Sequence, residues 1–385
     1  MVIYIRTQGA KIVKEGKHLL VKKEKTIYHT LFTYKLSQVV VFGNVEITHR
    51  ALAQLMRYNI DVVFMSYNGR YLGRIAPPES KNVFLHKLQY ARLDDHEFGL
   101  RLARCIVLGK LANMATILMR IKRTRNDTLP GRKSQEIRNL MHHLESADNM
   151  DSIRGYEGRG SAFYFEAFPR GFVQNMGFTR RIRRPPTDPV NSVLSLLYTF
   201  LMNRVYSAVR IAGLDPYPGF LHSIDYGRHS LVLDLMEEFR TIIADTLTLS
   251  LFNLKILQKE DFFVESTPGE LEWEDKTEEM PDVSKDSIGL ICGNETDQEI
   301  LDLPEQRMEN DTPASELRTG KYPVKLHHDA FKRVIEAFEK KLTTTFYYPL
   351  ADRKLTYGDV IIYQAEHFRK VIEGEAEVYQ PVLLK

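Results

Sequence analysis

The sequence predicts an α+β protein in which a small β-rich domain is followed by a larger, all-helical domain. Short β-branched and aromatic runs, bounded by glycine turns, fill roughly the first 75 residues. From about residue 82 apolar residues recur every three or four positions, which is typical of helices packed on a core. The Pro-rich break APPES separates the two patterns at residues 76–80. We therefore predict domains at residues 1–80 and 81–385.

The elements follow in order. The predicted strands are VIYI, HLLVKK, TIYHTLF, QVVVF, DVVFMS and RYLGRI. Asn68-Gly69 predicts a hairpin turn between the last two, and Thr48 is placed to cap a short helix, HRALAQLMRY. The first predicted helix of the second domain is long, from KNVFLHKLQYARL through GLRLARCIVLGKLANMATILMRIKR. The later helices are SQEIRNLMHHLESA, SIRGYEGRGSAFYFEAF, DPVNSVLSLLYTFLMNRVYSAVRIAG, HSLVLDLMEEFRTIIADTLTLSLFNL, DAFKRVIEAFEKKL and DVIIYQAEHFRKVIE.

Composition narrows the class of protein. Of the 385 residues, 43% are hydrophobic and 27% charged, as in ordinary globular proteins. The N-terminal residues contain no apolar signal core, and Asn203 and Arg204 interrupt the richest apolar stretch, so we expect a cytoplasmic protein with no membrane span. The two cysteines, Cys105 and Cys292, are far apart, which fits a reduced compartment and excludes a cysteine-built zinc site.

Charge is distributed unevenly along the chain. Residues 260–316 hold 19 Asp and Glu against three Lys and Arg, a local charge of −16, which leaves +19 for the remainder. A body this basic favours a polyanionic partner such as nucleic acid, although a generally basic surface is the alternative. We interpret the tract at about 265–318 as a flexible insertion, with one docked segment in SIGLICG.

The apolar segment LHSIDYGRHSLVLDLMEEF contains Asp234, Glu237 and Glu238, with His222 just upstream. Asp234 and Glu237 are three residues apart, so on a helix their carboxylates are neighbours that repel unless a cation or water compensates them. From the spacing alone the acids form either a solvated face or a metal-binding stripe.

A second acid stands in an unusual context. Glu157 lies in SIRGYEGRG, between glycines and flanked by Arg154 and Arg159. Each glycine costs a helix about 1 kcal/mol relative to alanine, which indicates close helix packing or the approach of a phosphate to the backbone. With His222, which follows the loop PYPGFL, and Glu237, this acid would form a donor set for Mg²⁺ or Mn²⁺.

The sequence resembles the spacer-acquisition integrases, the family numbered first among the CRISPR-associated proteins. The blocks that carry the resemblance are FGNVEITHRALAQLMRYNIDVVFMSYNGRYLGRI, SIRGYEGRGSAFYF, DPVNSVLSLLYTFLMNRVYSAVRIAGLDPYPGFLHS, HSLVLDLMEEFR, KYPVKLHHDAFKRVIEAFEKKL and the helix with Gln364-Ala365. It covers nearly the whole chain except residues 265 to about 318, a tract longer than expected between these helices. We interpret that tract as a solvated loop, the alternative being a DNA mimic that covers the basic face.

The resemblance implies a metal-dependent DNA endonuclease and integrase with a β-sandwich-like N-terminal domain, which forms homodimers, and a helical catalytic domain. Such proteins assemble on a small ferredoxin-like second CRISPR-associated protein. They insert short duplex DNA fragments at a CRISPR repeat by transesterification, forming branched DNA. The alternatives are a related mobile-element integrase and a non-catalytic DNA-binding scaffold of the same fold. An RNA-directed nuclease is less favoured, because no module for reading single-stranded bases is visible.

The resemblance also assigns residues. It places the metal ligands and catalytic residues at Glu157, His222 and Glu237, with Asp234 as second choice for a ligand and Asn191 beside the ligands without touching the metal. Some relatives have Asp where this chain has Glu237. The basic clusters either track DNA phosphates or are solvent-exposed loop charges. The DNA-binding candidates are Arg154, Arg159, Arg180, Arg181, Arg183 and Arg184, with a second cluster of Arg120, Lys122, Arg123 and Arg125.

Overall fold

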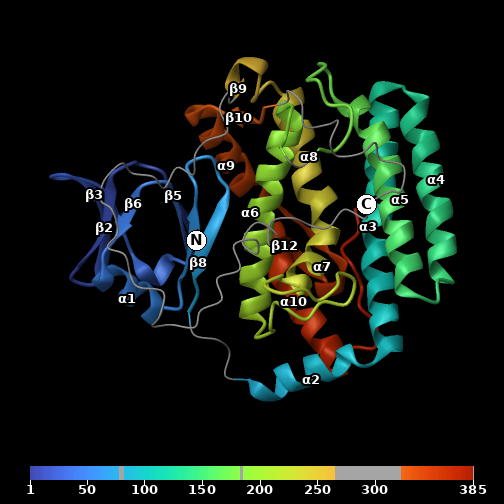
Figure 1. Ribbon diagram of the computed structural model, residues 1–385, viewed down its shortest axis with the longest axis horizontal. Coiled ribbons are helices and arrows are strands. Elements are labelled where there is room, and N and C mark those ends of the chain that lie inside the picture. Colours follow the sequence, from blue (N-terminus) through green and yellow to red (C-terminus); the bar gives the residue numbers. More distant parts are fainter. Residues whose placement is uncertain (78–81, 183–184, 265–321, 385) are drawn as a thin grey trace, which may run out of the picture.

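A computed structural model describes residues 1–77, 82–182, 185–264 and 322–384. The acidic tract, including SIGLICG, and the pair Arg183 and Arg184 lie outside the described residues. Figure 1 shows two β-sheets and helix α1, in blue, at one end of the molecule and the other helices at the opposite end.

The N-terminal region holds eight strands in two four-stranded sheets, ordered β1-β5-β7-β8 and β4-β3-β2-β6. In chain order they are β1 (Val2–Ile5), β2 (Ala10–Glu15), β3 (His18–Lys23), β4 (Thr26–Leu31), β5 (Gln38–Phe42), β6 (Val45–Ile47), β7 (Asp61–Met65) and β8 (Tyr71–Ile75). The six predicted strands are confirmed. Strands β2 and β6 were not predicted, because lysines interrupt the first and the second has three residues.

Two local predictions are also confirmed. The side chain of Thr48 accepts from the backbone N–H of Ala51 and caps α1 (His49–Arg57). Gly69 has a φ of 87° in the turn between β7 and β8, a conformation that glycine adopts without strain. That turn packs on Leu196 and Phe331 of the helical region, so it also helps to fix the sheets against the helices.

The two sheets and α1 share one core, which contains Ile12, Val21 and Val41 together with Leu55. The opposite face of the β1-β5-β7-β8 sheet packs on the helices, where the Phe42 ring lies 5.4 Å from the ring of Phe331. A two-layer arrangement of this kind matches the β-sandwich-like expectation.

Ten α-helices are assigned in the described part of the chain, nine of them after the sheets. Those nine are α2 (Val83–Leu93), α3 (His96–Arg125), α4 (Thr128–Glu145), α5 (Met150–Ala167), α6 (Pro189–Ile211), α7 (Ser230–Phe239), α8 (Thr246–Asn253), α9 (His328–Leu342) and α10 (Tyr357–Glu373). The single long helix predicted from residue 81 is wrong. It divides into α2 and α3, because the Asp95 side chain accepts from the Phe98 N–H and caps a new helix.

The prediction that the second domain is all-helical is also wrong. Strand β9 (Phe262–Val264) pairs antiparallel with β10 (Val324–Leu326), and β11 (Thr345–Tyr348) with β12 (Arg353–Thr356). Strand β9 precedes the acidic tract and β10 follows it, so their pairing brings together the residues on either side of the tract. A 3-10 turn at Pro349–Ala351 connects β11 and β12. The sequence pattern missed them because three- and four-residue strands carry too little periodicity.

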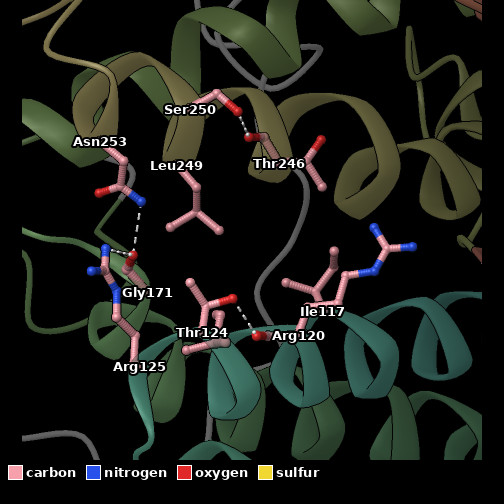
Figure 2. A pocket seen from close by; sticks show the side chains of 10 residues that line it. Ile117, Arg120, Thr124, Arg125, Gly171, Thr246, Leu249, Ser250 and Asn253 are labelled. Atoms are coloured by element: carbon pink, nitrogen blue, oxygen red, sulfur yellow. Dashed lines mark hydrogen bonds between the residues drawn. The ribbon is translucent and has the colours of Figure 1, made fainter.

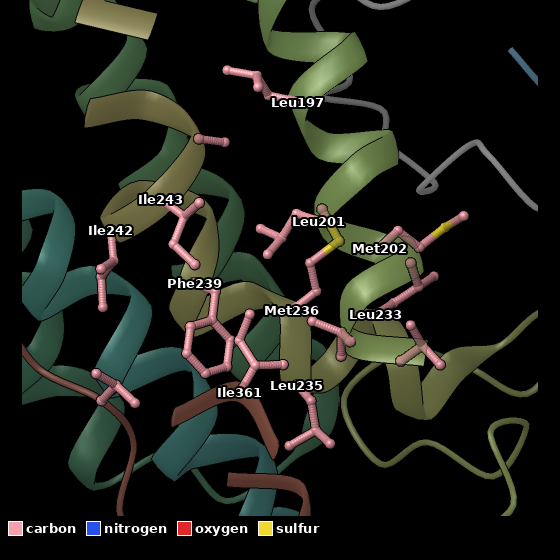
Figure 3. Close-up of a cluster of buried hydrophobic side chains, with 14 of the residues drawn as sticks. Leu197, Leu201, Met202, Leu233, Leu235, Met236, Phe239, Ile242, Ile243 and Ile361 are labelled. Atoms are coloured by element: carbon pink, nitrogen blue, oxygen red, sulfur yellow. The ribbon is translucent and has the colours of Figure 1, made fainter. Parts of the chain in front are cut away.

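Helix α7 lies at the centre of the helical region. All ten of its residues are buried, and in Figure 3 Leu233 and Met236 lie toward Leu201 and Met202 of α6. The interpretation of its acids as a solvated face is therefore wrong. A π-helical turn, η3 (Arg240–Asp245), continues α7 into α8, and such turns are frequent at functional sites.

Within the described residues, one helix is long and apolar enough to cross a membrane, α3. Since 67% of its apolar window is buried in the fold, α3 has the character of a core helix.

Candidate metal centre

His222 is held in position by the carboxylate of Asp234. Asp234 Oδ2 accepts from the N–H groups of Phe220 (2.6 Å) and Leu221 (2.9 Å), and Oδ1 accepts from the N–H of His222 (2.9 Å). The same Oδ1 lies 2.7 Å from His222 Nδ1. Because an ionised carboxylate only accepts, Nδ1 carries the proton and Nε2 is left with its lone pair. Asp234 is fully buried and already committed to four donors.

The loop that brings His222 to this position depends on a close approach at its start. A Cβ at Gly219 would lie less than 3.0 Å from the backbone of Ser230, the first residue of α7. The Pro/Gly-rich segment PYPGFL therefore does what its composition predicted: it lays the loop directly against the beginning of α7.

Glu237 faces three positively charged or chargeable groups. Its Oε2 lies 2.7 Å from Lys110 Nζ, and its Oε1 lies 3.2 Å from Arg240 Nη2 and 3.8 Å from His222 Nε2. Burial raises the pKa of this carboxyl, but the charges of Arg240 and Lys110, together with the hydrogen bond from Lys110, outweigh burial and hold the pKa at about 2. Glu237 is thus a fully buried carboxylate that stays ionised at neutral pH.

Glu157 reaches the same place from α5. Its Oε1 pairs with Lys110 Nζ and accepts from the Ser161 hydroxyl at 3.2 Å. The close approach of α5 to α3 depends on Gly160 of α5, because a Cβ there would lie less than 3.0 Å from the Leu111 side chain of α3. Close helix packing therefore explains Gly160, whereas a Cβ at Gly155 would meet nothing within 4 Å. Among the described ion pairs, Glu157 pairs with Lys110 of α3 and not with its own neighbour Arg159.

The structure thus brings Glu157, His222 and Glu237 together from α5, the loop before α7, and α7 itself. A carboxylate pair with an imidazole nitrogen suits Mn²⁺ or Mg²⁺ in its chemistry. As the side chains stand, no three His, Cys, Asp or Glu residues of the described chain are close enough to hold an ion. The position between the two carboxylates is taken by the ammonium of Lys110.

Sequence reasoning missed Lys110 and Arg240. The signal for Lys110 was the presence of a lysine inside the apolar run CIVLGKLANM. In the structure its side chain is 4% exposed. For Arg240 it was the spacing of three residues after Glu237, which places both side chains on one helical face. A buried cation within an apolar pattern needs an anionic partner, so each indicated a nearby acid.

The arginines predicted to bind DNA have different surroundings. Arg154 Nε donates to the Leu221 carbonyl at 2.8 Å, so this side chain ties α5 to the loop that carries His222. Arg159 and Arg180 are exposed, and their contact with DNA stays a prediction. Arg181 donates to the Asn191 side chain at 2.8 Å and to Ser195 at 3.0 Å, which makes it a structural group in this state.

Asn191 is fully buried at the start of α6, and its amide is used in fixing residues 180–182. Its Nδ2 donates to the Arg180 carbonyl (2.9 Å) and to Asp188 (2.6 Å), while its Oδ1 accepts from Arg181 and from the Ile182 N–H. The described contacts of Asn191 are with this loop rather than with Glu157, His222 or Glu237. A place beside the metal ligands stays a prediction.

Two members of the second basic cluster, Arg120 and Arg125, line a cavity of about 220 Å³ between α3 and α8 (Figure 2). Arg125 donates to the Gly171 carbonyl at 2.9 Å, and Asn253 donates to the same oxygen at the same distance. The hydroxyls of Thr124 and Ser250 each donate to a carbonyl of their own helix. The cavity is separate from the candidate metal centre, and these four polar groups already have partners within the fold.

Comparison with protein families identifies the chain. The family model described as CRISPR associated protein Cas1 matches residues 3–278. The chain belongs to the Cas1 family. The CRISPR-associated endonuclease Cas1 3 of Thermus thermophilus is 29% identical over 100% of this chain and 97% of its own length. The CRISPR-associated endonuclease Cas1 1 of Chlorobaculum tepidum is 33% identical over 69% of this chain and 79% of its own length.

Solved structures share the Cas1 fold. A casposase bound to integration product has a TM-score of 0.76 at 19% identity, covering 98% of this chain and 92% of its own. A Cas1 protein from Thermotoga maritima has a TM-score of 0.74 at 19% identity, over 99% and 100% of the two chains. A Cas6-RT-Cas1--Cas2 complex gives a TM-score of 0.75 at 21% identity, with all of this chain on 36% of that one. At these identities the likeness concerns the fold.

Proposed function

We propose that this Cas1-family protein is a metal-dependent DNA endonuclease and integrase of CRISPR adaptation, which inserts short duplex fragments at a CRISPR repeat by transesterification. The observation that carries the proposal is the convergence of Glu157, His222 and Glu237 from three separate segments onto one buried, charge-compensated position. Membership of a family whose curated relatives are named endonucleases supports the nuclease activity.

The metal would be Mg²⁺ or Mn²⁺, held by the carboxylates of Glu157 and Glu237 and by His222 Nε2. When bound, such an ion stabilises negative charge on a phosphodiester and lowers the pKa of an attacking hydroxyl. The chain contributes the rest. Asp234 fixes the His222 tautomer and aims Nε2 toward Glu237, and Arg154 braces the loop from α5. Arg240 keeps Glu237 ionised.

Asp234 acts in this proposal by orienting His222 rather than by binding the ion. Both of its oxygens already accept from backbone N–H groups, and one also faces His222 Nδ1. If Asp234 bound an ion, it would give up contacts that shape the loop at residues 220–222. Glu237, in contrast, faces the Lys110 ammonium, which a metal ion could replace.

Proposed partners follow from charge and from the relatives. The basic body would hold DNA as short duplexes, the CRISPR repeat and branched integration products. The exposed Arg159 and Arg180 are the described candidates for phosphate contacts. The proposal also includes a homodimer formed through the N-terminal sheets and a cytoplasmic location. It further includes assembly with a small ferredoxin-like second CRISPR-associated protein, which is supported by a structural relative named as a Cas6-RT-Cas1--Cas2 complex.

A second candidate is an integrase of a mobile element, because the casposase matches nearly the full length of the fold. The two functions differ in substrate: CRISPR adaptation joins short fragments to a repeat, whereas a mobile-element integrase joins DNA with defined terminal sequences. A non-catalytic scaffold is the third. Its carboxylates would not need to converge on a buried cation.

A strand-transfer assay with a CRISPR repeat and a short duplex, with and without Mg²⁺ or Mn²⁺, tests the proposal. Glu157→Gln and Glu237→Gln should each lower strand transfer about a hundredfold or more with the fold retained. Glu166→Gln is the matched control. It lies on the same helix as Glu157 and also pairs with a lysine, but with Lys133 instead of Lys110. Full activity of both variants, or activity without divalent metal, would refute the proposal.

A further inference from the structure

Lys110 holds the position that a metal would need. Its side chain is 4% exposed, and its ammonium pairs with Glu157 on one side and lies 2.7 Å from Glu237 on the other. Two buried or half-buried carboxylates side by side repel each other unless a cation lies between them. The protein therefore carries its own counter-ion at the candidate metal centre.

The chain is closely packed on both sides of Lys110. Its neighbour Gly109 packs on Pro381, where a Cβ would come closer than 3.0 Å, and its other neighbour Leu111 packs equally closely on Gly160. The lysine side chain, in contrast, has a flexible four-carbon stem. The ammonium can thus leave the carboxylates by side-chain rotation while α3 stays in place.

Arg240 is fixed where Lys110 can move. Its guanidinium faces Glu237 at 3.2 Å and lies over the Tyr198 ring at 5.3 Å, with its side chain 6% exposed. The described contacts link Arg240 to one of the two carboxylates, whereas Lys110 bridges both. An ion that bridges Glu157 and Glu237 would take the place of the lysine and leave the arginine in position.

We propose that metal binding at this site is an exchange, in which the ion displaces the Lys110 ammonium from between Glu157 and Glu237. The inference rests on the proposed function, since it concerns the same site. Lys110 is a positioning residue: it keeps the two carboxylates assembled before metal arrives, and it competes with the ion. The site is consequently formed in the metal-free protein, at the expense of metal affinity.

The first test measures Mn²⁺ binding to the full chain by the electron paramagnetic resonance of free Mn²⁺. Lys110→Met removes the competing charge and keeps an unbranched side chain only one atom shorter, so the Kd for Mn²⁺ should fall about tenfold or more. Lys133→Met is the control. Lys133 Nζ also lies between two carboxylates, Glu136 at 3.0 Å and Glu166 at 2.9 Å, with an 11% exposed side chain. That variant should lose stability without any change in Mn²⁺ affinity.

The second test needs no variant that might fail to fold. Acetylation of lysines in the wild-type protein, followed by mass spectrometry, should show Lys110 protected without metal and modified faster once Mn²⁺ is added. Lys133 should react at the same rate in both conditions.

Unchanged or weaker Mn²⁺ binding in Lys110→Met, or Lys110 labelling that does not respond to bound Mn²⁺, overturns the exchange. Glu237→Gln separates this failure from that of the proposed function. If wild-type Mn²⁺ binding does not depend on Glu237, the metal site itself is refuted and both proposals fail. If the binding does depend on Glu237 and Lys110→Met does not tighten it, the exchange alone fails.

Discussion

The glycines around Glu157 allow a matched comparison within one helix. Gly155 and Gly160 both lie in α5, where replacing glycine by alanine gains about 0.5–1 kcal/mol of helix stability. A Cβ at Gly155 meets nothing within 4 Å, so Gly155→Ala should stabilise the protein by about that amount. A Cβ at Gly160 would lie under 3.0 Å from the side chain of Leu111, which is fully buried.

Overpacking of this kind costs about 1–3 kcal/mol. Because the helix-propensity gain is common to both variants, their free energies of unfolding should differ by about 1–3 kcal/mol, with Gly160→Ala the less stable. Urea or thermal unfolding of the two variants and the wild type measures this difference. Because an added Cβ would widen the crossing of α3 and α5 that brings Glu157 to Lys110, Gly160→Ala should alter Mn²⁺ affinity while Gly155→Ala should not.

Equal stability of the two variants would refute the helix-crossing explanation. It would favour the other interpretation of the glycine pattern, in which a phosphate approaches the backbone. That interpretation predicts weaker DNA binding by both variants without any difference in unfolding.

Two further predictions concern the loop and the start of α7. Asp234→Asn replaces one acceptor oxygen by an NH₂ donor that would face backbone N–H groups. We therefore expect a lower melting temperature and about 10- to 100-fold weaker Mn²⁺ binding, as for a group that orients a metal ligand. Complete loss of Mn²⁺ binding, as expected for Glu237→Gln, would show that Asp234 is itself a ligand. Burial, together with the charge of Arg74, lowers the pKa of His229 to about 4 from an ordinary value near 6.5. The folded state thus binds this proton less readily than the unfolded state, and stability is lost as the pH falls from about 6.5 toward 4, by at most about 3 kcal/mol. The free energy of unfolding of His229→Gln should therefore fall less between pH 7 and pH 4.5 than that of the wild type. An equal fall in both proteins would show that His229 is not the group responsible.

Much of the fold followed from short-range patterns. The cap at Thr48, the hairpin at Gly69 and the β-branched and aromatic runs of the six predicted strands are local features, and the structure confirms each. The break between α2 and α3 depends on one side chain, Asp95, which accepts from the backbone only when the preceding chain leaves the helix. Periodicity alone gave no sign of that choice.

The site divides in the same way. Glu157, His222 and Glu237 could be named from the sequence, mainly through the family resemblance, and the structure brings them together. Lys110 could not, because it lies 47 residues before Glu157 on another helix. Its position follows from how closely α3 and α5 cross, which is a property of tertiary packing.

Three neighbouring acids on an apolar helix are explained by three different partners. The carboxylate of Asp234 gathers the loop before α7, and that of Glu237 faces Lys110 and Arg240. Glu238 accepts from the Tyr379 hydroxyl at 2.6 Å and the Val382 N–H at 2.6 Å, both in the segment after α10. A buried carboxylate without partners is costly, so each acid is tolerated because another segment supplies donors. Through these three acids, helix α7 is linked to the loop that carries His222, to Lys110 of α3 and to the segment after α10. The contacts of Asp234 and Glu238 thereby fix the helix on which Glu237 lies.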